Sequence, residues 1–185
     1  MKILRNIKEL NNELIQIRKK GLQIGLIPTM GSIHKGHLSL LKKSNNLKLY
    51  SIVTIYINPT QFNNKDDYLK YPKDRKKDIL KLKKNSCDAI FFPKQKEIYP
   101  KGLKTEKKVK KFRNILCDKF RPGHFDGVTT VVEFFLKTIH PNYAFFGEKD
   151  FQQFKIVNKI VEKYKLPIQI KNCPSIRLRN GMSIS

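Results

Sequence analysis

The sequence predicts an α/β fold, a doubly wound parallel sheet. Short runs rich in β-branched and aromatic residues alternate with longer segments of helical periodicity, which is the pattern of βαβ units. The run SIVTIYI at 51–57 is continuous enough for a strand buried on both faces. Glycine, histidine and amide residues follow several predicted strands, where ligands gather in such sheets.

The first expected element is an N-terminal helix. Ile3, Ile7, Leu10, Leu14 and Ile17 recur at spacings of three and four, which suits one helix packed on a core. Further strands are expected at 23–28, 51–57, 88–92, 143–146 and 168–171, and helices at 36–48, from 74 onward, at 128–140 and at 150–164. The segment 94–111 is basic and poorly periodic, which predicts a surface excursion.

Length and composition are those of one folded domain. The chain has 185 residues, of which 39% are hydrophobic, and these include 12 Phe and 7 Tyr, so a disordered basic tail is excluded. No linker interrupts residues 1–175, which we take as one domain. The net charge of +24 has two explanations: mutational drift toward Lys in an A/T-rich genome, or a surface selected for polyanions.

Targeting signals are weak. Cys87, Cys117 and Cys173 form no C-x-x-C pair, so reduced thiols are expected rather than a disulfide framework or a zinc site. The N-terminus lacks the apolar core of a secretory signal, and the acidic Glu9 and Glu13 argue against a transit peptide. No segment reaches the length of about 20 apolar residues that a membrane span needs. We expect a soluble, cytoplasmic protein.

The segment PTMGSIHKGHLSLL at 28–41 is the first that carries chemistry. It places His34 and His37 around Gly36 where a strand passes into a helix. A helix N-terminus attracts phosphate, and imidazoles donate hydrogen bonds to phosphate oxygens as charge builds in a transition state. The competing interpretations are surface histidines and a metal pair, but no third ligand has suitable spacing. Phosphate handling is therefore the prediction.

Three other segments carry candidate residues. YINPTQFNNKDDYLKYP at 56–72 offers the amides of Asn58 and Gln61 for a small hydroxy acid, although Asn-Pro is also ordinary turn chemistry. FFGEKDFQQF at 145–154 offers Lys149 to phosphate, and only one of its two adjacent glutamines is expected to face a cleft. In RPGHFDGVTTVV at 121–132, His124 is expected to be structural or at an interface.

These four segments, in this order and spacing, closely resemble the pantoate–β-alanine ligase (pantothenate synthetase) family. The resemblance implies a Rossmann-like fold of the nucleotidyltransferase type. A lone H-x-G-H would also fit aminoacyl-tRNA synthetases or cytidylyltransferases, so another nucleotidyl-transferring member of the superfamily is one alternative, and a basic nucleic-acid-binding protein is another. The resemblance implies that ATP adenylates pantoate with release of pyrophosphate, and that β-alanine then displaces AMP. It also implies Mg²⁺ on the phosphates and a homodimer, with no membrane or nucleic-acid partner.

The resemblance also assigns roles to individual residues. His37 matches the catalytic proton donor, and His34 and Lys149 are expected to contact phosphate. Gln61 matches a residue that binds pantoate next to β-alanine, and Gln153 and Asn58 are expected to contact pantoate. No protein ligand to a metal is expected. The implied ATP-binding residues are Met30, Gly31, Ser32, Ile33, His34, Lys35, Gly36, His37, Gly147, Glu148, Lys149, Asp150, Ile176, Ile184 and Ser185.

The end of the chain departs from the family pattern. After CPSIR the family continues through an acidic residue and glycine into an M/L-S-S-R-N loop that closes over the triphosphate, and then into a C-terminal domain. Here Arg179 and Asn180 differ from that pattern, and 176–185 holds only the start of the loop region. A fragment, an isolated domain and a decaying gene product all fit, and a fragment is favoured. We expect weak ligand binding and little AMP release from these 185 residues.

Overall fold

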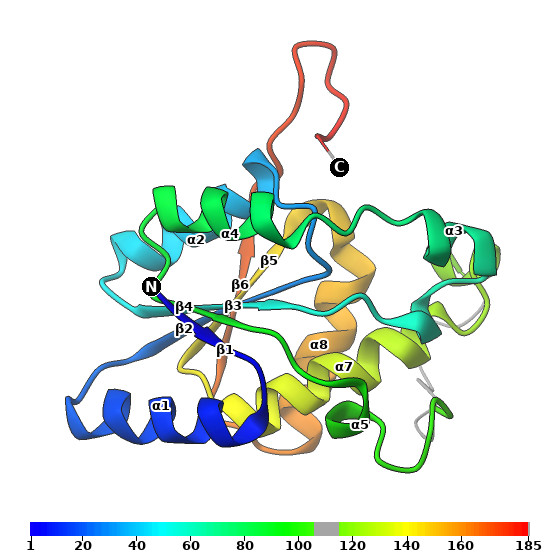
Figure 1. Cartoon of the computed structure of the whole chain (residues 1–185). Coiled ribbons are helices and arrows are strands. Elements are labelled where there is room, and N and C mark those ends of the chain that lie inside the picture. The colour runs from blue at the N-terminus through cyan, green and yellow to red at the C-terminus, as the bar shows by residue number, and fades with distance from the viewer. Residues whose placement is uncertain (106–114, 185) are drawn as a thin grey trace.

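Six parallel strands form one sheet in the order β1-β4-β3-β2-β5-β6 (Figure 1). The structure is a computed structural model that describes residues 1–105 and 115–184. The strands are β1 (Lys2–Leu4), β2 (Ile24–Thr29), β3 (Tyr50–Ile55), β4 (Ala89–Phe91), β5 (Tyr143–Gly147) and β6 (Gln169–Cys173). The all-parallel pairing confirms the predicted Rossmann-like sheet.

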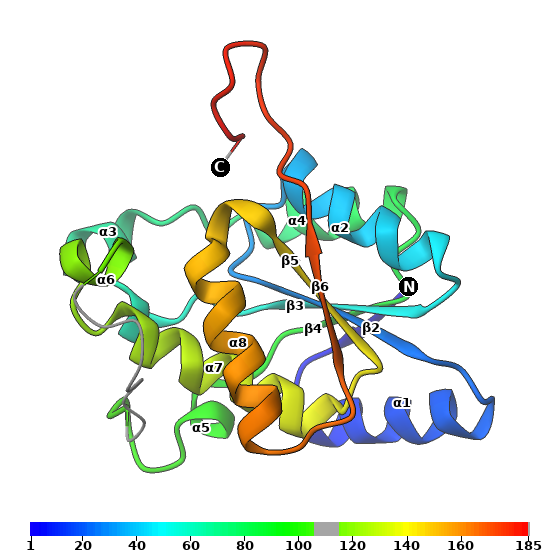
Figure 2. The same cartoon turned by 180° about the vertical axis from the view of Figure 1, so that it is seen from behind.

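Helices cover both faces of the sheet, so it is doubly wound (Figures 1 and 2). Helices α2 and α4 cover one face, while α1, α7 and α8 cover the other, and each layer has its own buried apolar cluster. The helices are α1 (Ile7–Lys19), α2 (Lys35–Asn46), α3 (Lys65–Lys70), α4 (Arg75–Lys84), α5 (Gln95–Ile98), α6 (Cys117–Phe120), α7 (His124–Ile139) and α8 (Phe151–Lys163), with short 3₁₀ turns at Pro59–Gln61 and Glu148–Asp150. In the described ranges, no helix is both long and apolar enough to cross a bilayer.

The N-terminal helix predicted from Ile3 is wrong at its start. Residues Lys2–Leu4 form the edge strand β1, which pairs with β4. The helix begins only at Ile7, because the side chain of Asn6 caps it by accepting from the Glu9 amide at 2.9 Å. Tertiary pairing overrides the helical spacing at Ile3, since the strand supplies β4 with hydrogen bonds that a helical turn could not.

Two other boundaries differ from the expectation. Helix α7 begins at His124, before the predicted Val128, because Gly123 in the left-handed region turns the chain into it. The predicted surface excursion is wrong at α5, where Ile98 and Tyr99 are buried against α7. Its later part, residues 106–111, lies outside the described residues.

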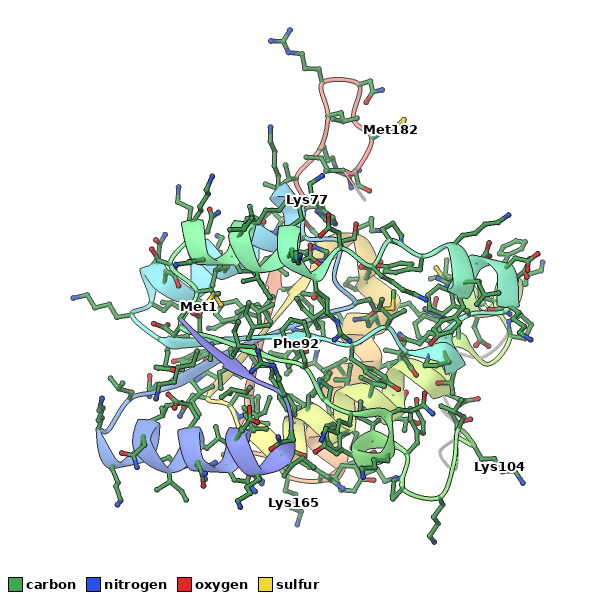
Figure 3. The ribbon with its side chains drawn as sticks, in the orientation of Figure 1. Met1, Lys77, Phe92, Lys104, Lys165 and Met182 are labelled. Carbon is green, nitrogen blue, oxygen red and sulfur yellow. The ribbon has the colours of Figure 1, made fainter. Side chains whose placement is uncertain are left out.

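The order of the strands creates a switch point beside β2. From β2 the chain moves to β3 on one side, whereas β5 pairs on the other side. The connections after β2 and β5 therefore diverge at the carboxyl ends of these strands, which leaves room for a ligand there. After β6 the chain leaves the sheet as an arm, with an antiparallel bridge between Arg177 and Ser183, and Figure 3 shows Met182 on its outer part.

Candidate functional site

A polar cavity opens at this switch point, beyond the carboxyl ends of β2 and β5. It receives side chains from the start of α2, the turn after β5, the first turn of α8 and the arm after β6. The sequence-predicted residues that line it are His34, Gly36, His37, Gly147, Lys149, Asp150, Gln153, Ile176 and Ile184. The tertiary structure thus joins residues that lie more than a hundred positions apart in the sequence.

His34 caps α2 with its own ring. Its Nδ1 accepts a hydrogen bond from the Gly36 amide at 3.1 Å, so the neutral ring carries its proton on Nε2. A Cβ on Gly36 would lie 2.8 Å from His34 Cε1, so this position requires glycine. Burial, Lys149 and Lys81 lower the pKa of His34, which favours this neutral donor form.

His37 stacks beside His34 on the next turn of α2. The two ring centroids are 3.9 Å apart, and the buried Nδ1 of His37 has no hydrogen-bond partner among the described residues. Burial first, and then the charges of His34, Lys149 and Lys81, lower its pKa from 6.5 to about 3. The ligand-free protein therefore presents a neutral imidazole at pH 7, which donates a hydrogen bond rather than a full proton.

This low pKa predicts a loss of stability in acid. Between pH 6.5 and pH 3 the unfolded chain binds a proton at His37 that the folded chain does not, so stability falls as the pH falls. From pH 7 to pH 5, His37 should lower the free energy of unfolding by about 2 kcal/mol. Urea titrations of the wild type and of His37→Asn at both pH values measure how much His37 contributes to this loss of stability. An equal loss in both proteins would contradict the prediction.

Lys149 lies opposite the two histidines. Its backbone amide donates to Ser175 Oγ at 2.8 Å, which ties the turn after β5 to the arm after β6. Its Nζ lies 3.7 Å from Asp150 Oδ1, and both side chains are exposed to solvent. The pKa shifts of His34 and His37 both include the charge of Lys149, so all three groups act on one space. Such a point charge suits a phosphate oxygen.

Only one of the two adjacent glutamines faces the cavity, as predicted. Gln153 lines it from α8. Gln152 is buried and holds the opposite side of the helix, since its amide donates to Ile115 O and accepts from the Cys117 amide, both at 3.1 Å.

The loop between β2 and α2 is held by Asp78, which the sequence analysis missed. Its two carboxylate oxygens accept from the amides of Ser32 at 2.9 Å and Ile33 at 2.7 Å. The backbone amides of Ser32 and Ile33, two predicted ATP contacts, are therefore hydrogen-bonded within the protein, and Ile33 is fully buried. The available signal was an acidic residue on the buried side of an otherwise Lys-rich helix.

Asn58 does not line this cavity, and its expected contact with pantoate stays a prediction. It is fully buried, its Nδ2 donates to Gly127 O at 3.1 Å, and its Oδ1 accepts from Thr60 and from the Tyr99 hydroxyl at 2.7 Å. Both polar atoms of the Asn58 side chain therefore bind groups within the protein. The network holds the turn that carries Gln61.

Gln61 lies beside α7 and not on the wall of this cavity. His124 Nδ1 donates to its backbone oxygen at 2.9 Å, and Arg121 donates to the same oxygen at 3.2 Å. His124 is therefore structural, as expected. The side-chain amide of Gln61 has no partner among the described residues, so it remains able to bind a ligand.

The remaining predicted residues lie around the cavity. Met30 and Gly31 line a neighbouring cavity on the far side of the β2–α2 loop. Lys35 and Glu148 are exposed beside the two helix starts, and Ser185 lies outside the described residues.

The family is decided by comparison with known proteins. A family model for pantoate-beta-alanine ligase matches residues 2–185. The chain belongs to the pantoate–β-alanine ligase family. It is 40% identical over 185 residues to the pantothenate synthetase of Caldicellulosiruptor saccharolyticus, and 43% identical over 187 residues to that of Buchnera aphidicola. In both comparisons the whole of this chain is covered, but only 66% of the relative.

A solved member of the family has the same fold. The pantoate-beta-alanine ligase of Francisella tularensis, in complex with β,γ-ATP and β-alanine, superposes with a TM-score of 0.93 at 40% identity. The match covers all of this chain and 71% of that one. Membership of this family sets aside the alternative of a different nucleotidyltransferase family.

Proposed function

We propose that this chain carries the ATP- and pantoate-binding domain of a cytoplasmic ligase that condenses pantoate with β-alanine. The observation that carries the proposal is the convergence of His34, His37 and Lys149 on one cavity at the switch point of a sheet from this family. The F. tularensis relative was solved with a nucleotide analogue and β-alanine, which supports the same two ligands here.

The proposed chemistry has two steps. A carboxylate oxygen of pantoate attacks the α-phosphorus of ATP, so that an acyl–phosphate bond forms and pyrophosphate leaves. The neutral amine of β-alanine then attacks the acyl carbon, an amide bond forms, the nitrogen loses one proton, and AMP leaves. The first step requires no base, because the nucleophile is already ionised. It depends on positioning and on donors for the developing charge.

The residues fit this division of work. His34 Nε2–H and the neutral His37 ring are the proposed donors to phosphate oxygens, and Lys149 supplies the positive charge. Gln153 and Gln61 are the proposed pantoate contacts, with Gln61 next to β-alanine. Gly147 and Asp150 are proposed to lie near the ribose, and Ile176 near the adenine.

The arm after β6 is proposed as the start of the segment that closes over the phosphates, which would divide the chain into 1–175 and 176–185. Ile176, Ser183 and Ile184 already line the cavity, which supports this division. A homodimer also remains a prediction, and sedimentation analysis tests it.

Magnesium is proposed to arrive on the nucleotide. In the described part of the chain, no group of three or more His, Cys, Asp or Glu side chains could hold a metal ion, and Asp78 has both oxygens bonded to amides. Mg²⁺ usually keeps several waters and binds through substrate phosphates, which supports its arrival with the nucleotide.

Two single variants test the proposed division between nucleotide and pantoate contacts. Lys149→Ala should weaken ATP binding by about 10- to 100-fold, because an ionic contact to phosphate contributes about 1.5–3 kcal/mol, and should leave pantoate binding unchanged. Gln153→Ala should do the reverse. Calorimetric titration of each ligand measures both effects, and pantoate-dependent AMP release tests the reaction itself.

The matched control is Lys155→Ala, which removes the same charge from an exposed position of α8. Equal losses of ATP affinity in Lys149→Ala and Lys155→Ala would show that only net charge matters, and would overturn the assignment of Lys149 as a phosphate contact. Loss of both ligands in Gln153→Ala would contradict the pantoate contact.

A further inference from the structure

A second cavity, of about 970 Å³, opens along the same edge of the sheet. It lies beyond the carboxyl ends of β1, β4 and β3, whereas the candidate nucleotide cavity lies beyond β2 and β5. The loop that carries Met30 and Gly31 separates the two, and they share no lining residue. The second cavity is therefore separate from the candidate nucleotide cavity, although Met30 and Gly31 of its lining are among the implied ATP contacts.

Its charged lining is strongly basic. Arg5, Lys73, Arg75 and Lys94 all line it, and among the described residues none of these four forms an ion pair. Among the described residues of the lining, Asp78 is the only acidic one, and its two oxygens already accept hydrogen bonds from backbone amides. The positive charge of the cavity is therefore not neutralised within the described part of the protein.

Two of these cations are held by aromatic rings that also line the cavity. The guanidinium carbon of Arg75 lies 5.3 Å from the centroid of the Phe92 ring, and Lys73 Nζ lies 4.7 Å from the centroid of the Tyr68 ring. Figure 3 shows Phe92 at the level of the strands, below α4. Such contacts limit the conformational freedom of the two long side chains, so less side-chain entropy is lost when a ligand binds them.

Tyr56 gives an independent indication of a ligand. It lines the cavity, only 9% of it is exposed, and its hydroxyl has no hydrogen-bond partner among the described residues. Burial raises the pKa of this phenol, so it stays protonated and can only gain from an acceptor. A buried hydroxyl without a partner is unfavourable, and an oxyanion beside the cations would supply the missing acceptor.

We propose that this second cavity binds a phosphate-type oxyanion through Arg75 and Lys73, with the Tyr56 hydroxyl as a further donor. The planar guanidinium of Arg75 matches two phosphate oxygens at once. Two sources supply this chemistry: free inorganic phosphate, and pyrophosphate, whose link to the site rests on the proposed function. Pyrophosphate has the higher charge and the greater span, so four cations should bind it more tightly.

Calorimetric titrations of the whole chain with sodium pyrophosphate and with sodium phosphate, at physiological ionic strength, test the proposal. Arg75→Gln combined with Lys73→Gln should weaken pyrophosphate binding at least tenfold, and Tyr56→Phe should weaken it several-fold. Tyr56→Phe removes only an unpaired hydroxyl, so it should fold as the wild type does. Tenfold preference for pyrophosphate assigns the site to that anion, and equal affinities assign it to free phosphate.

The matched control is Lys76→Gln combined with Lys77→Gln. These exposed residues do not line the cavity, and Figure 3 shows Lys77 on the side of α4 that faces away from the sheet. Equal losses of pyrophosphate affinity in the two double variants would show that binding depends only on net charge, and would overturn the proposal. Wild-type affinity in both Tyr56→Phe and the Arg75/Lys73 double variant would overturn it as well.

Lys149→Gln separates this site from the candidate nucleotide cavity. In a Lys149→Gln background, where phosphate binding in that cavity is weakened, the Arg75/Lys73 double variant should still lower pyrophosphate affinity at least tenfold. No further loss of affinity in that background would place the anion in the candidate nucleotide cavity and overturn the proposal. Binding requires no turnover, so failure of the ligase assay and failure of this site are separate results. If the double variant does not fold in circular dichroism, Arg75→Lys keeps the charge, removes the fork and should still weaken binding.

Discussion

His37→Asn should slow the pantoate-dependent release of pyrophosphate by about 10²- to 10³-fold, which is the usual effect of removing one preorganised donor. The ring is neutral and stacks on His34 with their centroids 3.9 Å apart, so it is held in place before the nucleotide arrives. Asparagine keeps an amide donor but places it closer to the helix. The rate should therefore fall far more than ATP affinity, and single-turnover measurements separate the two quantities.

The control for this prediction is His140→Asn. His140 is exposed and ends α7 with a φ of 47°, a left-handed conformation that asparagine tolerates well. Its rate should match that of the wild type. A His37→Asn rate within about threefold of the wild type would remove this residue from the proposed charge stabilisation, since the loss of a preorganised donor costs far more.

Gly127→Ala should lower the free energy of unfolding by about 3 kcal/mol, the upper range for overpacking a core. A Cβ at this position would lie 2.7 Å from the backbone oxygen of Thr60 and 2.8 Å from its carbonyl carbon. Backbone atoms cannot swing away as a side chain can, so the turn before Gln61 must move. For a chain of this size the midpoint of thermal unfolding should fall by about 6–12 °C.

Two further variants bracket this effect. Gly147→Ala should unfold near the wild-type temperature, because a Cβ there meets no atom within 4 Å and its φ is −77°. Thr60→Ala added to Gly127→Ala should not restore stability, because the clash with the Thr60 backbone remains. Rescue by Thr60→Ala would show that the hydroxyl, at 2.6 Å, was the cause.

The phosphate-binding signals in the sequence were local and could be recognised without a structure. His34, Gly36 and His37 lie within one turn, and Gly147, Lys149 and Asp150 lie within another, so each cluster is formed by its own stretch of chain. The alternation of strand and helix was equally visible, because a buried parallel strand and an amphipathic helix each carry their own periodicity.

Long-range contacts could not be predicted in this way. Ile3 fits a helical spacing, and only pairing with β4 makes it a strand residue. The amide of Asn58 could bind a ligand as far as the sequence shows, but in the fold it is buried and hydrogen-bonded to Gly127 and Tyr99. Asp78 lies in a helix of lysines and holds a loop distant in sequence.

The sequence alone therefore determined the fold class and the family, and it predicted two phosphate-binding segments. All of these depend on residues close together along the chain. The tertiary structure decided which candidate residues share a cavity and which are hydrogen-bonded within the protein that surrounds it. It also showed that a second, basic cavity lies beside the first. The physical reason is that burial and pairing depend on neighbours brought from other elements. The pKa of His37 and the unpaired hydroxyl of Tyr56 both arise from such neighbours.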